Sequence, residues 1–274
     1  MRNSRLKALI RDLPQGFIVD TPWLIARGID SRSIHDYVKH GWIERIVRGV
    51  YRRPLHHTES DHLSWQVILL SCQHLMQRKM HLGGRNALEY AYNKHSVRLR
   101  TRQTVHFYGD YPSWINRLPT KDSIKLHKAS LFAGNSVGLI EEPLLAFNKN
   151  YVAEIWHWPV RASCRERAIL EMISHIRRDS DFEHVDMQFQ SLKFLCPKRL
   201  MQLLMACVSI KVKRLFFAFA DLYQFPWREN LDPTQIDLGS GPRALFSGGS
   251  YHPIYQISLP DFFFENPYED DCIF

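Results

Sequence analysis

The sequence predicts an α+β protein with a small basic N-terminal domain and a larger domain of mixed helices and strands. Its 274 residues are long for one hydrophobic core, and 45% of them are hydrophobic, which is enough to build a real core. The net charge is also uneven. Residues 1–55 hold 11 Lys/Arg and 5 Asp/Glu, a net charge of +6 out of +8 for the whole chain. Such a concentration indicates an anionic partner for this segment, and a solvated basic surface is the alternative.

The first helices are indicated by spacing and capping residues. Apolar residues recur at i, i+4 and i+7 across residues 4–13, as on one face of a helix. Thr21 followed by Pro22 is typical of a helix start, and we expect Thr21 to be the N-cap. This second helix is predicted to run to Arg27, and Gly28 supplies the turn that ends it.

The next helix is predicted to begin at Asp30 or Ser31. Ile34, Tyr37 and Val38 fall on one face of it, and the opposite face is polar. Two short helices joined by a tight turn that contains glycine form the pattern of a helix-turn-helix.

A hairpin is predicted directly after these helices. Residues 42–47 read as a strand, Arg48 and Gly49 as a tight turn, and residues 50–53 as the returning strand. A hairpin in this position is the wing of a winged helix-turn-helix. The polar segment 54–61 reads as a linker, so the predicted domains are a winged helix-turn-helix over 1–55 and an α+β domain over 62–274.

The second domain shows a mixed pattern of periodicities. We expect helices over 63–76, 81–92, 165–176, 197–208 and 212–223, and strands over 104–108, 123–127 and 250–259. The acidic run of Asp179, Asp181, Glu183 and Asp186 reads as a solvated loop, and a site for a divalent cation is the alternative.

The winged helix-turn-helix carries the most specific functional prediction. The second helix of such a unit lies in the major groove, and residues near its N-terminus face the base edges. The residues expected there are Ser31, Arg32, Ser33, His35 and Asp36. Contacts to phosphates or to the minor groove are expected from Lys39, Arg45, Arg48, Arg52 and Arg53. The alternative is a winged helix that contacts another protein.

Patterns that would indicate an enzyme are incomplete. Residues 134–138 match G-x-S-x-G, but the Gly/Asn/Ser cluster reads as a turn between strands, whereas a nucleophile elbow needs a helix after the serine. The glycines at 239–241 lack a following Lys-Ser/Thr, and no H-E-x-x-H spacing is present. The basic stretch at Lys94, Arg98, Arg100 and Arg102 is either a solvated face or an extension of a DNA footprint. We therefore expect no catalytic residue, no metal and no cofactor.

The cellular setting is indicated by cysteine usage and hydropathy. The five cysteines are odd in number, widely spaced and without C-x-x-C, which favours a reducing cytoplasm over a disulfide framework or a zinc site. No apolar run reaches the length of a membrane span, and the N-terminus lacks the apolar core of a secretion signal. A cytoplasmic protein without membrane contact is expected.

Several segments together resemble a known family. The wing segment 41–51 (GWIERIVRGVY) is similar to the N-terminal domain of the AbiEi antitoxins, and 81–89 (HLGGRNALE) is similar to the start of that family's second domain. Weaker likenesses occur at 165–171, 213–216, 238–241 and 255–257. Asn86 stands where the family pattern favours Thr or Ser, which affects only the start of a helix.

The resemblance implies two activities. AbiEi proteins are antitoxins and transcriptional regulators of type IV toxin–antitoxin systems, which act in phage abortive infection. The N-terminal domain would bind inverted repeats in double-stranded DNA upstream of its own operon and repress it. The second domain would counter a nucleotidyltransferase-type toxin without a stable complex. A DNA- or RNA-directed enzyme, such as a nuclease or a nucleotidyltransferase relative, and a protein-interaction module are the alternatives.

Overall fold

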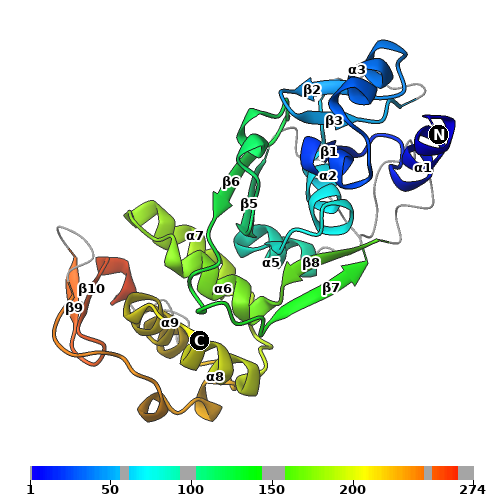
Figure 1. Cartoon of the computed structure of the whole chain (residues 1–274). Helices are drawn as coiled ribbons and strands as arrows, with labels where there is room; N and C mark the ends of the chain where they lie inside the picture. Colours follow the sequence, from blue (N-terminus) through cyan, green and yellow to red (C-terminus); the bar gives the residue numbers. More distant parts are fainter. Residues whose placement is uncertain (1, 56–61, 93–102, 144–157, 244–248, 265–274) are drawn as a thin grey trace. The chain divides into compact units, whose positions relative to one another are not determined.

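The computed structural model describes residues 2–55, 62–92, 103–143, 158–243 and 249–264 (Figure 1). Its chain divides into two compact units. Unit 1 comprises Met1–Lys128 and Ile140–Ala162, and unit 2 comprises Ala129–Leu139 and Ser163–Phe274. Both units contain helices and strands, so the predicted mixed α+β class is confirmed.

The N-terminal part of unit 1 has the predicted order of elements. These are α1 (Arg2–Asp12), β1 (Ile18–Asp20), α2 (Thr21–Ala26), α3 (Ser31–Lys39), β2 (Glu44–Val47) and β3 (Val50–Arg52). The strands form an antiparallel sheet in the order β1-β3-β2. Gly49 closes the hairpin with a φ of 81°, a conformation that side chains with a Cβ rarely adopt.

The cap of α2 differs from the prediction. The N-cap is Asp20, whose carboxylate accepts a hydrogen bond from the Trp23 backbone N–H at 3.1 Å. Thr21 is the first helical residue, and its hydroxyl donates to the Gly49 carbonyl at 3.3 Å. Asp and Thr are both good caps, and neighbouring positions are hard to separate because sequence patterns place helix ends only to within a residue or two.

The rest of unit 1 is built on a five-stranded sheet in the order β6-β5-β4-β8-β7. Its elements are α4 (Trp65–Leu70), a π-helical turn (Ser71–Leu75), β4 (Met80–Leu82), α5 (Gly84–Tyr92), β5 (Thr104–Gly109), a 3₁₀ helix (Ser113–Arg117), β6 (Ser123–His127), β7 (Leu139–Pro143) and β8 (Pro159–Ser163). β4 pairs antiparallel with β5 and parallel with β8, and β5 pairs parallel with β6.

Strands β5 and β6 confirm the prediction, whereas β4 was expected as the opening of a helix. All three residues of β4 are buried. A central strand that is buried on both faces has no polar alternation, so its sequence does not show the period of a strand.

One hydrophobic core runs through unit 1. It includes Phe17 and Trp23 from the N-terminal segment together with Ile68, Phe107 and Val160 from the second part of the unit. The predicted domain boundary between residues 55 and 62 therefore lies inside a compact unit rather than between two units.

Hydrogen bonds also tie the N-terminal segment to the rest of unit 1. The Ile18 N–H donates to the Ser71 hydroxyl at 3.1 Å, and the Trp23 indole donates to the Leu75 carbonyl at 2.8 Å. The Trp114 indole donates to the Asp20 carboxylate at 3.4 Å. These bonds fix β1 and the start of α2 to residues more than 50 positions away in the chain.

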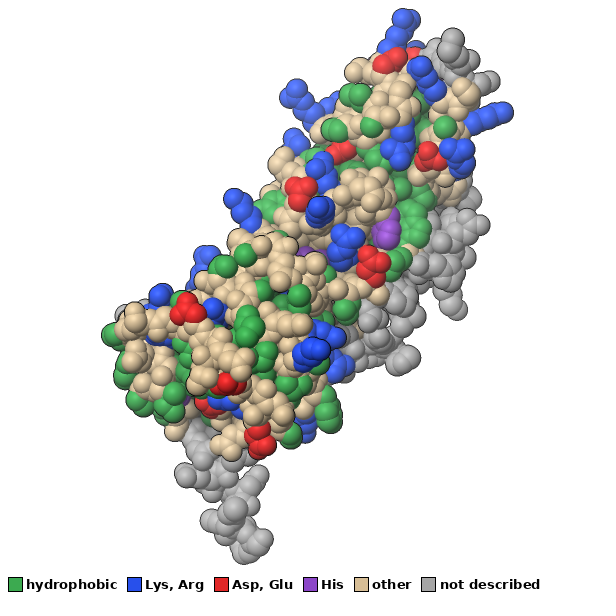
Figure 2. All heavy atoms as spheres, turned by 60° about the horizontal axis from the view of Figure 1, so that its bottom comes forward, with side chains coloured by type: hydrophobic (Ala, Val, Ile, Leu, Met, Phe, Trp, Pro, Cys, Tyr) green, Lys and Arg blue, Asp and Glu red, His purple; other side chains and the backbone are tan. Residues whose placement is uncertain are grey.

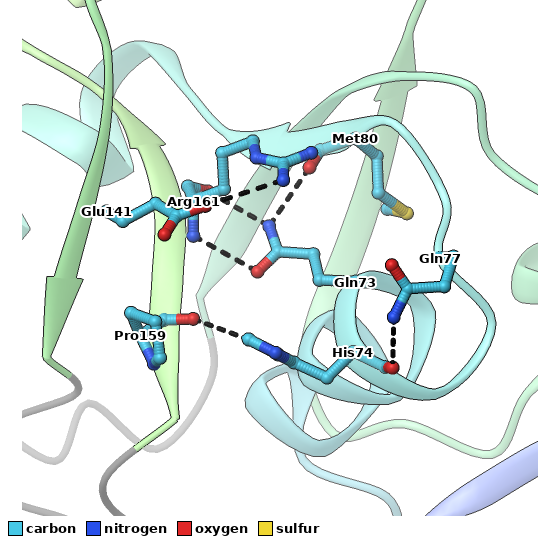
Figure 3. Close-up of polar contacts among 7 residues, drawn as sticks. All are labelled: Gln73, His74, Gln77, Met80, Glu141, Pro159 and Arg161. Carbon is cyan, nitrogen blue, oxygen red and sulfur yellow. Dashed lines mark hydrogen bonds and ion pairs between the residues drawn. The ribbon is translucent and has the colours of Figure 1, made fainter.

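The π-helical turn is also bonded to strand β8 (Figure 3). The amide of Gln73 donates to the carbonyls of Met80 and Arg161, both at 3.0 Å, and accepts from the Arg161 N–H at 3.1 Å. The His74 ring lies 2.7 Å from the Pro159 carbonyl oxygen. β4 and β8 pair at Leu82 and Ala162. Next to this pair, the buried Gln73 amide supplies the hydrogen bonds of the Met80 and Arg161 backbone groups.

Unit 2 is mainly helical. Its elements are α6 (Arg165–Ser174), α7 (Asp179–Phe189), α8 (Pro197–Ala206), α9 (Ile210–Tyr223), β9 (Ser250–His252) and β10 (Ile257–Leu259). The helices α6, α8 and α9 confirm the predictions.

Two predictions for unit 2 are wrong. The acidic run is helix α7, because Asp181 caps its start by accepting hydrogen bonds from the N–H groups of Arg177 and Arg178 at 2.9 and 3.1 Å. The single strand expected over 250–259 is a hairpin, β9 and β10, because residues 253–256 turn and Gln256 adopts a φ of 48°.

Candidate nucleic-acid interface

Helix α3 presents one buried and one exposed face. Ile34 and Tyr37 are buried in the core of unit 1. The side chains of Arg32, His35 and Lys39 are exposed, and their spacing of three and four residues places them in one row along the helix. Ser31 is exposed at the start of this helix, and Ser33 and Asp36 are half-buried. The predicted base-reading residues thus share one element, with an exposed cationic row at its surface.

The start of α3 is held by a capping interaction. The Asp30 carboxylate accepts a hydrogen bond from the Ser33 backbone N–H at 2.7 Å. This backbone hydrogen bond lowers the pKa of Asp30, and the positive charge of Arg5 acts in the same direction. Arg5 is exposed on α1, so it adds a cation beside the start of α3 that the sequence pattern did not single out.

The hairpin adds two exposed cations, Arg45 on β2 and Arg48 at the turn. Neither side chain forms an ion pair within the described part of the chain. Figure 2 shows Lys and Arg side chains gathered on the upper part of the visible face, where the N-terminal elements lie in Figure 1. Cations without carboxylate partners keep their field available to an anion.

Arg52 and Arg53 are used inside the fold. Arg52 is buried, and its guanidinium lies 2.5 Å from the Glu44 carboxylate on the paired strand. The guanidinium of Arg53 donates to the carbonyls of Ile10 and Leu13, at 2.6 and 3.0 Å, and burial lowers its pKa. Nine of the ten predicted contact residues therefore lie on α3 and the hairpin, and eight of these have exposed or half-buried side chains, whereas Arg52 and Arg53 have partners inside the fold.

The segment that matches G-x-S-x-G is a turn in unit 2. The guanidinium of Arg167 donates to the carbonyls of Asn135 and Val137, both at 2.8 Å, and forms a buried ion pair with Glu171 at 3.1 Å. Ser136 is exposed, and strand β7 rather than a helix follows it. This geometry differs from a nucleophile elbow.

Neither a metal cluster nor a membrane span is found in the ranges that the structure describes. No group of three or more His, Cys, Asp or Glu side chains there is arranged to hold a metal ion. None of the helices among these residues has the length and apolar character needed to cross a bilayer. His56, His57 and the basic stretch from Lys94 to Arg102 lie outside the described residues.

Comparison with known proteins places the chain in a family. Two short helices, a tight turn and a hairpin at the start of a mixed α/β chain are typical of transcriptional regulators. Residues 2–99 match the family model of the AbiEi antitoxin N-terminal domain of transcriptional regulators, and residues 102–260 match that of the AbiEi antitoxin transcriptional regulators of type IV toxin–antitoxin systems. The chain belongs to the AbiEi antitoxin family of transcriptional regulators.

A solved structure supports the fold. The chain is similar to the RV2827C protein from Mycobacterium tuberculosis with a TM-score of 0.51 and 17% identity, over 93% of this chain and 90% of that one. No curated protein matches the sequence. The two family models meet near residue 100.

Proposed function

We propose that the protein binds double-stranded DNA through α3 and the β2–β3 hairpin, as a winged helix-turn-helix, and represses its own operon from inverted repeats upstream of it. The observation that carries this proposal is the exposed row of Arg32, His35 and Lys39 on a helix whose other face is anchored in the core. A helix fits the major groove of B-DNA, and an arginine there can bind guanine with two hydrogen bonds.

The hairpin supplies the contacts that hold the helix in register. Arg45 and Arg48 stand on an element directly after α3, where a wing meets the phosphates or the minor groove. Such contacts carry little sequence information but fix orientation, so we assign base reading to α3 and anchoring to Arg45, Arg48 and Lys39.

We further propose that the chain counters a nucleotidyltransferase-type toxin, without forming a stable complex with it. Family membership supports this second activity. The direct assay is coexpression of the toxin gene with the wild-type protein. Failure of the full-length protein to protect the toxin-expressing cells would contradict this proposal.

Fluorescence anisotropy with the full chain tests DNA binding. The probes are a labelled duplex from upstream of the gene and a scrambled duplex, each across a salt series. The variants are Arg32→Ala and Arg48→Ala, with Lys193→Ala on unit 2 as the matched control because that side chain is also exposed.

Each variant has its own expected result. Arg32→Ala is expected to reduce the preference for the upstream duplex by a factor of roughly 5 to 100, as the loss of a bidentate base contact would. Arg48→Ala is expected to weaken binding to both duplexes and to flatten the salt dependence. Lys193→Ala should bind like wild type. Absence of salt-dependent binding by the wild-type protein would instead favour a protein-interaction module.

A further inference from the structure

A second group of exposed cations lies in unit 1, beyond the winged helix. Arg117 ends the 3₁₀ helix, Lys121 precedes β6, Lys125 lies within it, and Lys128 follows it, and all four side chains are exposed. We name this group the β6 row. None of its members forms an ion pair with a carboxylate among the residues that the structure describes.

The β6 row lies along an edge of the five-stranded sheet, because β6 is the outermost strand and, among the residues that the structure describes, its strand partner is β5. Ile124 and Leu126 alternate with Lys125 and pack against the core of unit 1. The alternation therefore turns Lys125 away from the core, and the pairing of β6 with β5 holds it in place.

The row is connected to the helix-turn-helix through buried contacts. Trp114, three residues before Arg117, donates its indole N–H to Asp20, the residue that caps α2. The segment between Arg117 and Lys121 is also held by Leu63, whose N–H donates to the Pro119 carbonyl at 2.9 Å.

The net charge of unit 1 as a whole also favours an anionic partner for this unit. Counted over the two units, the sequence holds 24 Lys/Arg and 13 Asp/Glu in unit 1, against 12 and 15 in unit 2. The excess positive charge thus extends past residue 55 and ends with unit 1. From Lys121 to Lys128 an extended chain covers roughly 23 Å, a length over which one DNA strand presents several phosphates.

We propose that the β6 row binds the phosphates of the DNA that flanks the sequence read by α3. This inference rests on the proposed DNA binding and extends the footprint onto the sheet of unit 1. The other explanation for lysines on an edge strand is protection against pairing with a second sheet, which requires no DNA.

The test compares two double variants of the full chain. Lys121→Gln with Lys125→Gln removes two charges from the row, and Lys193→Gln with Lys198→Gln removes two exposed charges from unit 2. Both are titrated by anisotropy on a 50-base-pair duplex from upstream of the gene and on its scrambled counterpart, across a salt series. Hydroxyl-radical footprinting on the upstream duplex and sedimentation velocity complete the measurement.

We expect the row variant to bind both duplexes about tenfold or more weakly near 0.15 M salt, with a salt slope lower by roughly 1.8 for two lost phosphate contacts. Protection should shorten on one flank while the preference for the upstream duplex stays. The unit 2 variant should match wild type.

A row variant with the affinity, salt slope and footprint of wild type would overturn the inference and leave DNA binding by α3 standing. Self-association of that variant would then show that the lysines protect the edge strand. Failure of wild type to bind either duplex would overturn the proposed function as well.

Discussion

Arg48 and Arg52 show how near neighbours in one hairpin take different roles. Arg48 lies at the turn with its side chain exposed, whereas Arg52 is buried against Glu44. Both are arginines in the predicted wing, so residue type and spacing predict the same function for them. The difference arises because β3 is the central strand of its sheet and its inward side chains enter the core.

Arg52→Ala is expected to lower the free energy of unfolding by about 1 to 3 kcal/mol, because it leaves Glu44 without its partner and empties a buried site. Arg48→Ala, as the control, should change it by less than about 0.5 kcal/mol. Urea denaturation followed by circular dichroism measures both values. An equal effect of the two substitutions would contradict the assignment of Arg52 to the interior.

The lowered pKa of Glu166 makes the stability of the fold depend on pH. Burial works to raise the pKa of Glu166, but hydrogen bonds from the Cys196 N–H at 2.8 Å, from the Cys164 thiol and from Arg199 at 3.2 Å outweigh it and lower the pKa. A carboxyl with a lowered folded pKa stabilises the fold above its unfolded pKa of about 4.3, and this stabilisation is lost as the pH falls through the folded value.

We therefore expect the free energy of unfolding to fall below about pH 4.3, and Glu166→Gln to be less stable at pH 7 and to lose less on acidification. Denaturant midpoints measured between pH 7 and pH 3 for both proteins check this. Parallel pH profiles of wild type and variant would show that Glu166 is not the group responsible.

At the scale of elements, the π-helical turn has the most connections. It binds the N-terminal segment through Ser71 and Leu75 and strand β8 through Gln73 and His74 (Figure 3). π-Helical turns are rare, and this one is hydrogen-bonded both to the N-terminal segment and to strand β8. The orientation of α2 and α3 relative to the sheet therefore depends on this turn.

Gln73→Leu is expected to destabilise the protein by about 2 to 4 kcal/mol, since it removes the hydrogen bonds that the Gln73 amide makes to the Met80 carbonyl and to the carbonyl and N–H of Arg161. Gln77→Ala is the matched control, because the exposed Gln77 amide donates only to the His74 carbonyl and its loss should cost less than about 0.5 kcal/mol. Thermal unfolding distinguishes them, and a similar melting temperature for both variants would contradict a central role for Gln73.

At the scale of the whole molecule, the N-terminal segment shares one hydrophobic core with the five-stranded sheet of unit 1. Phe17, Trp23 and Leu24 lie in one core with residues of the five-stranded sheet, and the N-terminal segment is hydrogen-bonded to Ser71, Leu75 and Trp114. We therefore expect that the polar segment 54–61 does not separate two parts that fold independently.

A fragment of residues 1–55 is expected to lack a cooperative unfolding transition, because its half of the core would face water. Circular dichroism melting and amide dispersion in an NMR spectrum measure this, with the full chain as the reference. A sharp thermal transition of the fragment alone would show that the N-terminal segment folds by itself.

The sequence by itself determined the local elements of the N-terminal segment, the mixed class of the chain and its family. Capping residues, helical spacing and turn glycines act over a few residues, so α2, α3 and the hairpin could be read from them. The exposed row on α3 followed from the same spacing.

Only the tertiary structure decided the partners of these elements. It gave Arg52 and Arg53 partners within the fold, joined the N-terminal segment to the sheet, placed β4, β7 and β8 in that sheet, and brought the β6 row into the same unit as α3. These outcomes depend on contacts between residues far apart in the chain. Periodicity reports which side of an element is apolar, but it does not report which distant element covers that side.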